Sequence, residues 1–168
     1  MAIITINSFA QNTESKKSVP VGMSKHDYSV KIVRFADLEA VVKKNDDKLY
    51  VVNFWATWCR PCVMELPEFM VVNKTHRSNP HFKMILVSLD LAKEAETGVR
   101  SFLEKRKMDV DVYLLDDNKH MNEWIPAIDK NWSGAIPATV FYRNGKKLEF
   151  IENKMQKSEL EQIITKYL

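Results

Sequence analysis

The 168-residue chain contains two cysteines, four glycines and six prolines. Two cysteines exclude a fold held together by several disulfides. With 45% apolar and 28% charged residues, the composition is that of a globular protein rather than a disordered or fibrous one. No apolar run reaches the roughly 20 residues that a membrane-spanning helix needs. The length suits one compact domain with its own core.

The chain also lacks a marked excess of charge of either sign. Its 25 lysines and arginines are interspersed with 22 aspartates and glutamates, which gives a net charge of +3. Because there is no basic block and no acidic tail, nucleic acid is not an expected partner.

The first 27 residues differ in character from the rest. Ile3, Ile4 and Ile6 form a short apolar patch, and Ser8 and Ala10 place small residues at the two positions that a signal peptidase reads. The patch lacks a basic start and is short, so a frayed terminus is the alternative. We interpret residues 1–27 as a signal remnant and polar linker, and residues 28–168 as the folded domain. This interpretation predicts an exported, periplasmic protein.

From residue 28 onward, apolar patterns predict alternating strands and helices. Strands are expected at 30–35, 49–55, 82–89, 110–115, 138–142 and 147–151. Helices are expected at 37–44, at 61–78 with a break or bend near Pro67, at 94–107 and at the C-terminus, with one helical turn within 118–128. Asn144-Gly145 predicts a hairpin, and Ser158 with Glu161 predicts a capping box. This order indicates an α/β protein whose mixed sheet is covered on both faces.

The two cysteines lie close together, directly after the buried strand 49–55. Pro61 suits the first turn of a helix, so Cys59 is expected at the helix N-terminus. Unpaired N–H groups there, and the charge of Arg60, stabilise a thiolate. Cys59 is therefore the predicted nucleophile of a reversible dithiol. Cys62, one turn into the helix, is predicted to face inward and to resolve the mixed disulfide.

A zinc site is the main alternative for a Cys-x-x-Cys pair. The chain has no second cysteine pair, and its four histidines show no ligand-like spacing. We therefore expect no metal and no cofactor.

Other residues near the pair are candidates for supporting roles. Glu65 lies three positions beyond Cys62 and shares its helical face, so its carboxylate could move protons or tune that thiol. A partly exposed helix glutamate is the alternative. Trp58 is predicted to form part of a docking surface, Trp55 to pack in the core and Trp132 to line a substrate groove.

A family resemblance rests on three stretches: Val-Asn-Phe-Trp-Ala-Thr-Trp-Cys-Arg-Pro-Cys at 52–62, then Glu65 and Pro67, and Ile136-Pro137-Ala138-Thr139 before the Asn-Gly turn. Together they resemble the thioredoxin superfamily, and within it the TlpA-like (ResA-type) branch of exported bacterial thiol-disulfide oxidoreductases. The resemblance covers residues 28–168. It implies a thioredoxin fold with a central helix–strand insertion at about 91–125, although the branch's usual Pro-Asp-Phe hairpin is replaced by a strand and helix.

The resemblance also implies partners and site residues. Protein disulfides or dithiols would be the substrates, a membrane or periplasmic protein the electron donor, and the protein would be a monomer working in the reducing direction. Cytochrome c biogenesis or repair of misoxidised cysteines would be its task. Pro137 would be a cis-proline, so that the Ile136 backbone, with Trp58, Arg60 and Pro61, binds substrate.

One departure and two competing functions accompany the resemblance. Asn53 stands where thioredoxins have a buried aspartate, which makes Glu65 the better candidate for a proton relay. A peroxiredoxin-like peroxidase is one competing function, although Trp58 and the paired Cys62 argue against it. A non-enzymatic metal-binding module of the same fold is the other.

Overall fold

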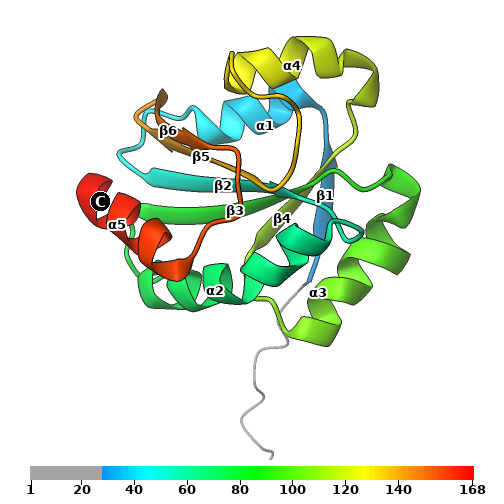
Figure 1. The fold of residues 1–168 in the computed structure, drawn as a ribbon, viewed down its shortest axis with the longest axis horizontal. Coiled ribbons are helices and arrows are strands. Elements are labelled where there is room, and N and C mark those ends of the chain that lie inside the picture. The colour runs from blue at the N-terminus through cyan, green and yellow to red at the C-terminus, as the bar shows by residue number, and fades with distance from the viewer. Residues whose placement is uncertain (1–27) are drawn as a thin grey trace, which may run out of the picture.

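The protein is described from a computed structural model, which describes residues 28–168 (Figure 1). The predicted signal remnant and linker, residues 1–27, lies outside the described residues.

A single mixed sheet of six strands runs through the middle of the described chain (Figure 1). Its order is β1-β4-β3-β2-β5-β6. Four strands, β1, β4, β3 and β2, run parallel to one another. β5 pairs antiparallel with β2, and β6 pairs antiparallel with β5. The strands are β1 (Val30–Val33), β2 (Leu49–Trp55), β3 (Phe82–Ser88), β4 (Asp111–Leu115), β5 (Ala138–Arg143) and β6 (Lys146–Ile151).

Helices cover both faces of this sheet, as predicted (Figure 1). α1 (Phe35–Val42) and α4 (Met121–Ile128) lie on one face, and α2 (Arg60–His76), α3 (Ser101–Arg106) and α5 (Lys157–Tyr167) lie on the other. A 3-10 turn (Ala92–Glu94) and a π-helical segment (Ala95–Arg100) lead into α3, and a 3-10 turn (Asn118–His120) leads into α4.

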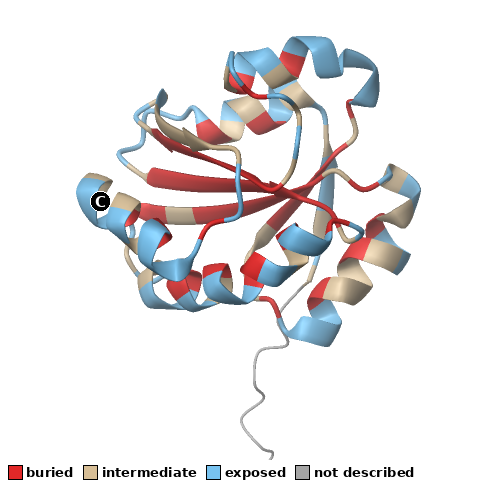
Figure 2. Cartoon of the chain, viewed as in Figure 1, coloured by how far each residue is buried: buried red, intermediate tan, exposed pale blue. Residues whose placement is uncertain are grey.

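The central strand β2 divides the core between the two faces. All of its residues are buried (Figure 2), and alternate side chains point to opposite sides. Tyr50 and Phe54 join the apolar cluster under α1 and α4. Leu49 packs into the cluster under α2 and α5, and Trp55 into the one beside α3. Packing on both faces therefore holds β2 in position, and this fixes where the loop after its C-terminal end begins.

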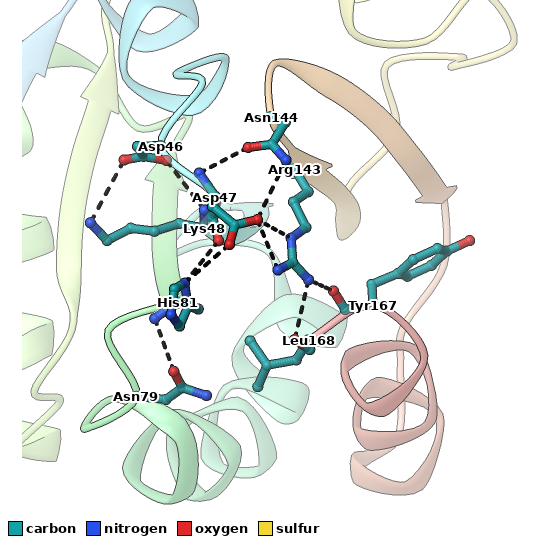
Figure 3. A network of polar contacts seen from close by, with 9 residues as sticks. All are labelled: Asp46, Asp47, Lys48, Asn79, His81, Arg143, Asn144, Tyr167 and Leu168. Carbon is teal, nitrogen blue, oxygen red and sulfur yellow. Dashed lines mark hydrogen bonds and ion pairs between the residues drawn. The ribbon is translucent and has the colours of Figure 1, made fainter.

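A polar network closes the end of the sheet where β2 begins (Figure 3). Arg143 donates to Asp47 Oδ1 at 2.9 and 3.1 Å and also bonds the Tyr167 carbonyl. Asn144 Oδ1 accepts from the Asp47 N–H at 2.8 Å. Both turn residues of the predicted hairpin have positive φ, 50° at Asn144 and 73° at Gly145. A Cβ on Gly145 would lie 3.0 Å from the Lys43 carbonyl oxygen, so glycine is required there.

Several predicted boundaries are wrong. Phe35 begins α1 instead of ending β1, because its N–H donates to the Asp117 carboxylate at 3.1 Å. α2 continues through Pro67 without a break. The expected helical turn within 118–128 is the eight-residue α4.

The capping box of the last helix is also misplaced in the prediction. It is formed by Gln156 and Glu159, two residues before the predicted pair Ser158 and Glu161. The Gln156 N–H donates to the Glu159 carboxylate at 2.7 Å, which sets the start of α5.

Candidate active site

Cys59 and Cys62 form a disulfide at the N-terminus of α2, with the two Cα atoms 5.3 Å apart. Cys59 is the N-cap, and its Sγ accepts from the Cys62 N–H at 3.4 Å. Cys59 is 6% exposed and Cys62 is fully covered. An N–H of the first helical turn thus points at the Cys59 sulfur, which favours a negative charge on it after reduction.

The loop that joins β2 to this disulfide is held by Asp90, just after β3. The buried Asp90 carboxylate accepts from the Thr57 N–H at 3.0 Å, from the Thr57 hydroxyl at 2.5 Å and from the Ser88 hydroxyl at 2.7 Å. Three donors satisfy a carboxylate that is only 1% exposed. The sequence interpretation missed Asp90, although an aspartate directly after a buried strand is an available signal.

The wall opposite the disulfide is formed by the two residues that precede β5. The Ile136–Pro137 peptide bond is cis, as predicted, and the Ile136 carbonyl oxygen lies 3.6 Å from Cys59 Sγ. Pro137 itself is buried and Ile136 is partly exposed. The structure therefore brings Ile136 and Pro137 together with the cysteines, across 77 positions of sequence.

Glu65 lies in the interior and is 1% exposed, so the alternative of a partly exposed glutamate is wrong. Its carboxylate accepts from Asn53 Nδ2 and from the Met155 N–H, each at 2.8 Å. Burial raises the pKa of Glu65 to about 7, because desolvation of the charged form outweighs these two hydrogen bonds. A carboxyl with this pKa exchanges its proton near neutral pH.

Asn53 links Glu65 to β5. Its Nδ2 also donates to the Thr139 hydroxyl at 3.0 Å, so both amide hydrogens are used. Its Oδ1 has no hydrogen-bond partner among residues 28–168. The amide cannot act as a base, and it orients the carboxyl instead.

The exposed surface around the disulfide consists of Trp58, Arg60 and Pro61. The Trp58 side chain is 67% exposed. Leu91 is 47% exposed and directly follows Asp90, the residue that holds the loop before Cys59. Trp55 is fully buried, as predicted. Trp132 does not line a groove as predicted: it is 5% exposed and its ring packs 4.9 Å from that of Phe54.

In residues 28–168, no group of three or more histidine, cysteine, aspartate or glutamate side chains is placed to hold a metal ion. Within the same range, no helix has the length and apolar character needed to cross a membrane.

Known proteins resemble this chain in sequence and fold. The sequence model of the AhpC/TSA family matches residues 19–151. Thioredoxin-like protein YneN of Bacillus subtilis is 30% identical over 112 residues, which cover 66% of this chain and 62% of YneN. Sporulation thiol-disulfide oxidoreductase A of the same organism is 25% identical over 115 residues, covering 68% of this chain and 64% of the relative. The chain thus spans less than two thirds of these relatives.

A solved structure agrees in fold. It is that of a secreted Mycobacterium tuberculosis disulfide oxidoreductase homologous to Escherichia coli DsbE, with a TM-score of 0.54 and 23% identity. The match covers 73% of this chain and 84% of that one. The predicted membership of the thioredoxin superfamily is confirmed: the chain belongs to the AhpC/TSA family and has the thioredoxin fold.

Proposed function

We propose that this protein is an enzyme that exchanges its Cys59–Cys62 pair with disulfides or dithiols of other proteins. The observation that carries the proposal is the disulfide at the N-terminus of α2, with the Ile136 carbonyl 3.6 Å from Cys59 Sγ. Two of the similar proteins support it, because their names describe a thiol-disulfide oxidoreductase and a disulfide oxidoreductase.

In the reducing direction, the Cys59 thiolate attacks one sulfur of a substrate disulfide. A Cys59–substrate disulfide forms, and the other substrate sulfur leaves as a thiolate that takes a proton. The Cys62 thiolate then attacks Cys59 Sγ, which forms the Cys59–Cys62 disulfide and releases the second substrate thiolate. The enzyme dithiol has lost two electrons and two protons, and the substrate has gained them.

Glu65 serves as the proton acceptor for the buried Cys62 thiol in this proposal. Both residues lie on α2, three positions apart, so they share a face of the helix. The pKa of about 7 allows the carboxylate to take a proton at neutral pH and to return it in the reverse direction.

The substrate binds at the exposed rim of the disulfide. An extended segment pairs with the backbone of Ile136 beside Pro137, as a strand adds to a sheet edge. Trp58, Arg60 and Pro61 contact the segment from the other side of Cys59. This arrangement is supported by the 67% exposure of Trp58, which is high for so large an apolar side chain.

The protein is an exported, periplasmic monomer that reduces specific proteins and takes electrons from a membrane or periplasmic donor, with cytochrome c biogenesis or repair of misoxidised cysteines as its task. The secreted character of the solved relative supports export.

Trapping tests the two cysteine roles. Cys62→Ser should accumulate a mixed disulfide with a protein substrate on Cys59, because the resolving thiol is missing. Cys59→Ser is the matched control and should trap nothing. A partner attached in the control, or none in Cys62→Ser, would contradict the assignment.

Turnover separates the competing functions. The reduced protein should reduce insulin disulfides much faster than hydrogen peroxide, and its thiols should bind zinc or copper too weakly to compete with a chelator. Preferential peroxide turnover would instead identify a peroxidase, and tight metal binding without turnover a metal-binding module.

A further inference from the structure

The connection between β6 and α5 contacts both sides of the candidate site. Its first residue, Glu152, binds the turn that precedes the cis-proline, and its Met155 N–H donates to Glu65 at 2.8 Å. Met155 is buried among side chains of α2 and α5, which fixes this end of the connection in place. The connection therefore joins the wall of the site to the helix that carries the cysteines.

The Glu152 carboxylate accepts hydrogen bonds from several donors of one short turn, residues 133–135. It accepts from the Ser133 N–H at 3.1 and 3.2 Å, from the Ala135 N–H at 3.3 Å and from the Ser133 hydroxyl. The hydroxyl hydrogen bond is the main reason that the pKa of Glu152 lies below its usual range. At neutral pH the group is an anion, and hydrogen bonds to a charged acceptor are the stronger kind.

This turn places the Ile136 backbone. Gly134 has a φ of 89°, a left-handed conformation that glycine adopts without strain, and the chain bends there. On the inner side, the Trp132 indole N–H donates to the Ala135 carbonyl at 2.8 Å. Ser133 and Ala135 are exposed, and Glu152 holds their N–H groups from the outer side. The next residue is Ile136, whose carbonyl faces Cys59.

We propose that Glu152 is a positioning residue for substrate binding. Its carboxylate holds the turn of residues 133–135, and through it the Ile136 backbone, at the distance from Cys59 that a substrate strand needs. This inference rests on the proposed disulfide exchange. Glu152 does not touch the reacting sulfurs, so its effect falls on binding rather than on the exchange step.

The variant Glu152→Gln tests the inference with little change in shape. A glutamine amide keeps one acceptor but turns an NH2 group toward the backbone N–H groups of the turn, which loosens it. We expect the half-saturating concentration of insulin to rise about tenfold, with the maximum rate little changed. Single turnovers of the pre-reduced protein, mixed with increasing insulin, give both quantities.

Two comparisons show whether the effect passes through the turn. Glutathione disulfide is too small to reach the Ile136 backbone while it reacts with Cys59, so its second-order rate constant should not change in Glu152→Gln. The constant for insulin should fall, and the ratio of the glutathione disulfide constant to the insulin constant should therefore rise about tenfold. Glu149→Gln is the matched control: Glu149 lies in β6, three positions before Glu152, and accepts from Lys166 and Tyr167, away from the turn. It should leave both substrates unchanged.

Ser133→Ala tests the same contact from the other side, because it removes the hydroxyl that donates to Glu152. The Ser133 hydroxyl donates to Glu152 and also accepts from the Ala135 N–H at 3.3 Å. Because the first contact is shared with Glu152, the loss of insulin binding in the double variant should be smaller than the two single losses combined. Independently of activity, amide hydrogen exchange of Ser133 and Ala135 should be slow in the unmodified protein and faster in Glu152→Gln.

The outcomes separate this inference from the proposed function. If the unmodified protein fails to reduce insulin, the proposed function is wrong, whatever the exchange of the amides. If it reduces insulin and Glu152→Gln binds insulin equally well, or if both substrates weaken alike, the positioning role is wrong.

Discussion

Replacing Glu65 by glutamine should remove a pH-dependent loss of stability. Burial raises the pKa of this carboxyl from 4.5 to about 7. Between these values, the unfolded chain has released a proton that the folded protein still holds. The folded state thus binds more protons, and its free energy of unfolding falls as the pH rises through this window.

The size of the effect follows from the shift in pKa. At about 1.4 kcal/mol for each pH unit, a rise from 4.5 to about 7 corresponds to about 3 kcal/mol of stability lost by the time Glu65 is ionised. The glutamine side chain carries no charge at any pH and avoids this loss. Its amide can donate to Asn53 Oδ1, which lacks a partner among residues 28–168, if the Asn53 amide turns over.

The assay is equilibrium unfolding in urea of the oxidised protein over a series of pH values. The oxidised form is chosen because disulfide-bonded cysteines do not titrate. Relative to the unmodified protein, Glu65→Gln should gain about 3 kcal/mol between about pH 4 and about pH 8. Glu123→Gln, at an exposed position of α4, is the matched control and should run parallel to the unmodified protein.

Parallel curves for Glu65→Gln and the unmodified protein would refute the reasoning. They would mean that Glu65 has the same pKa in the folded and unfolded states. Glu65 would then not be a proton acceptor near neutral pH.

Three further changes probe the core, the loop and the rim of the site. Phe69→Ala removes a fully buried ring from the cluster between α2 and α5 and should cost about 3–5 kcal/mol in urea unfolding. Asp90→Asn leaves a donor of Thr57 or Ser88 without an acceptor and should cost about 1–3 kcal/mol in the same assay. Trp58→Ala should change stability by less than about 0.5 kcal/mol, since the ring is exposed, but should raise the half-saturating insulin concentration at least about threefold; equal binding would exclude Trp58 from the docking surface.

Features that depend on neighbouring residues were predictable from the sequence. The continuous apolar run of β2 predicted a central strand, and Asn144-Gly145 predicted the hairpin because both residues tolerate positive φ. The spacing of Cys59 and Cys62 with Pro61 predicted the start of α2. The cis geometry of Pro137 came from the family resemblance, since most bonds to proline are trans.

Features that depend on distant partners were missed. The burial of Glu65 requires Met155, 90 positions away, and Glu152 meets Ser133 across a turn and two strands. Helical periodicity places Glu65 on a face, but it carries no information on what covers that face. Trp132 was misplaced for the same reason, because its contact with Phe54 joins residues that no local pattern relates.

The division of the core by β2 places the three buried tryptophans in a way that suits fluorescence spectroscopy. Trp55 packs in the cluster that contains both cysteines, whereas Trp124 and Trp132 pack together on the other face of the sheet. A disulfide quenches emission from a neighbouring indole, so Trp55 and the exposed Trp58, which directly precedes Cys59, should brighten on reduction while Trp124 and Trp132 stay constant. Intrinsic fluorescence would then report the redox state through the tryptophans near the cysteines. The pair on the other face of the sheet would report whether the protein is folded, without any added label.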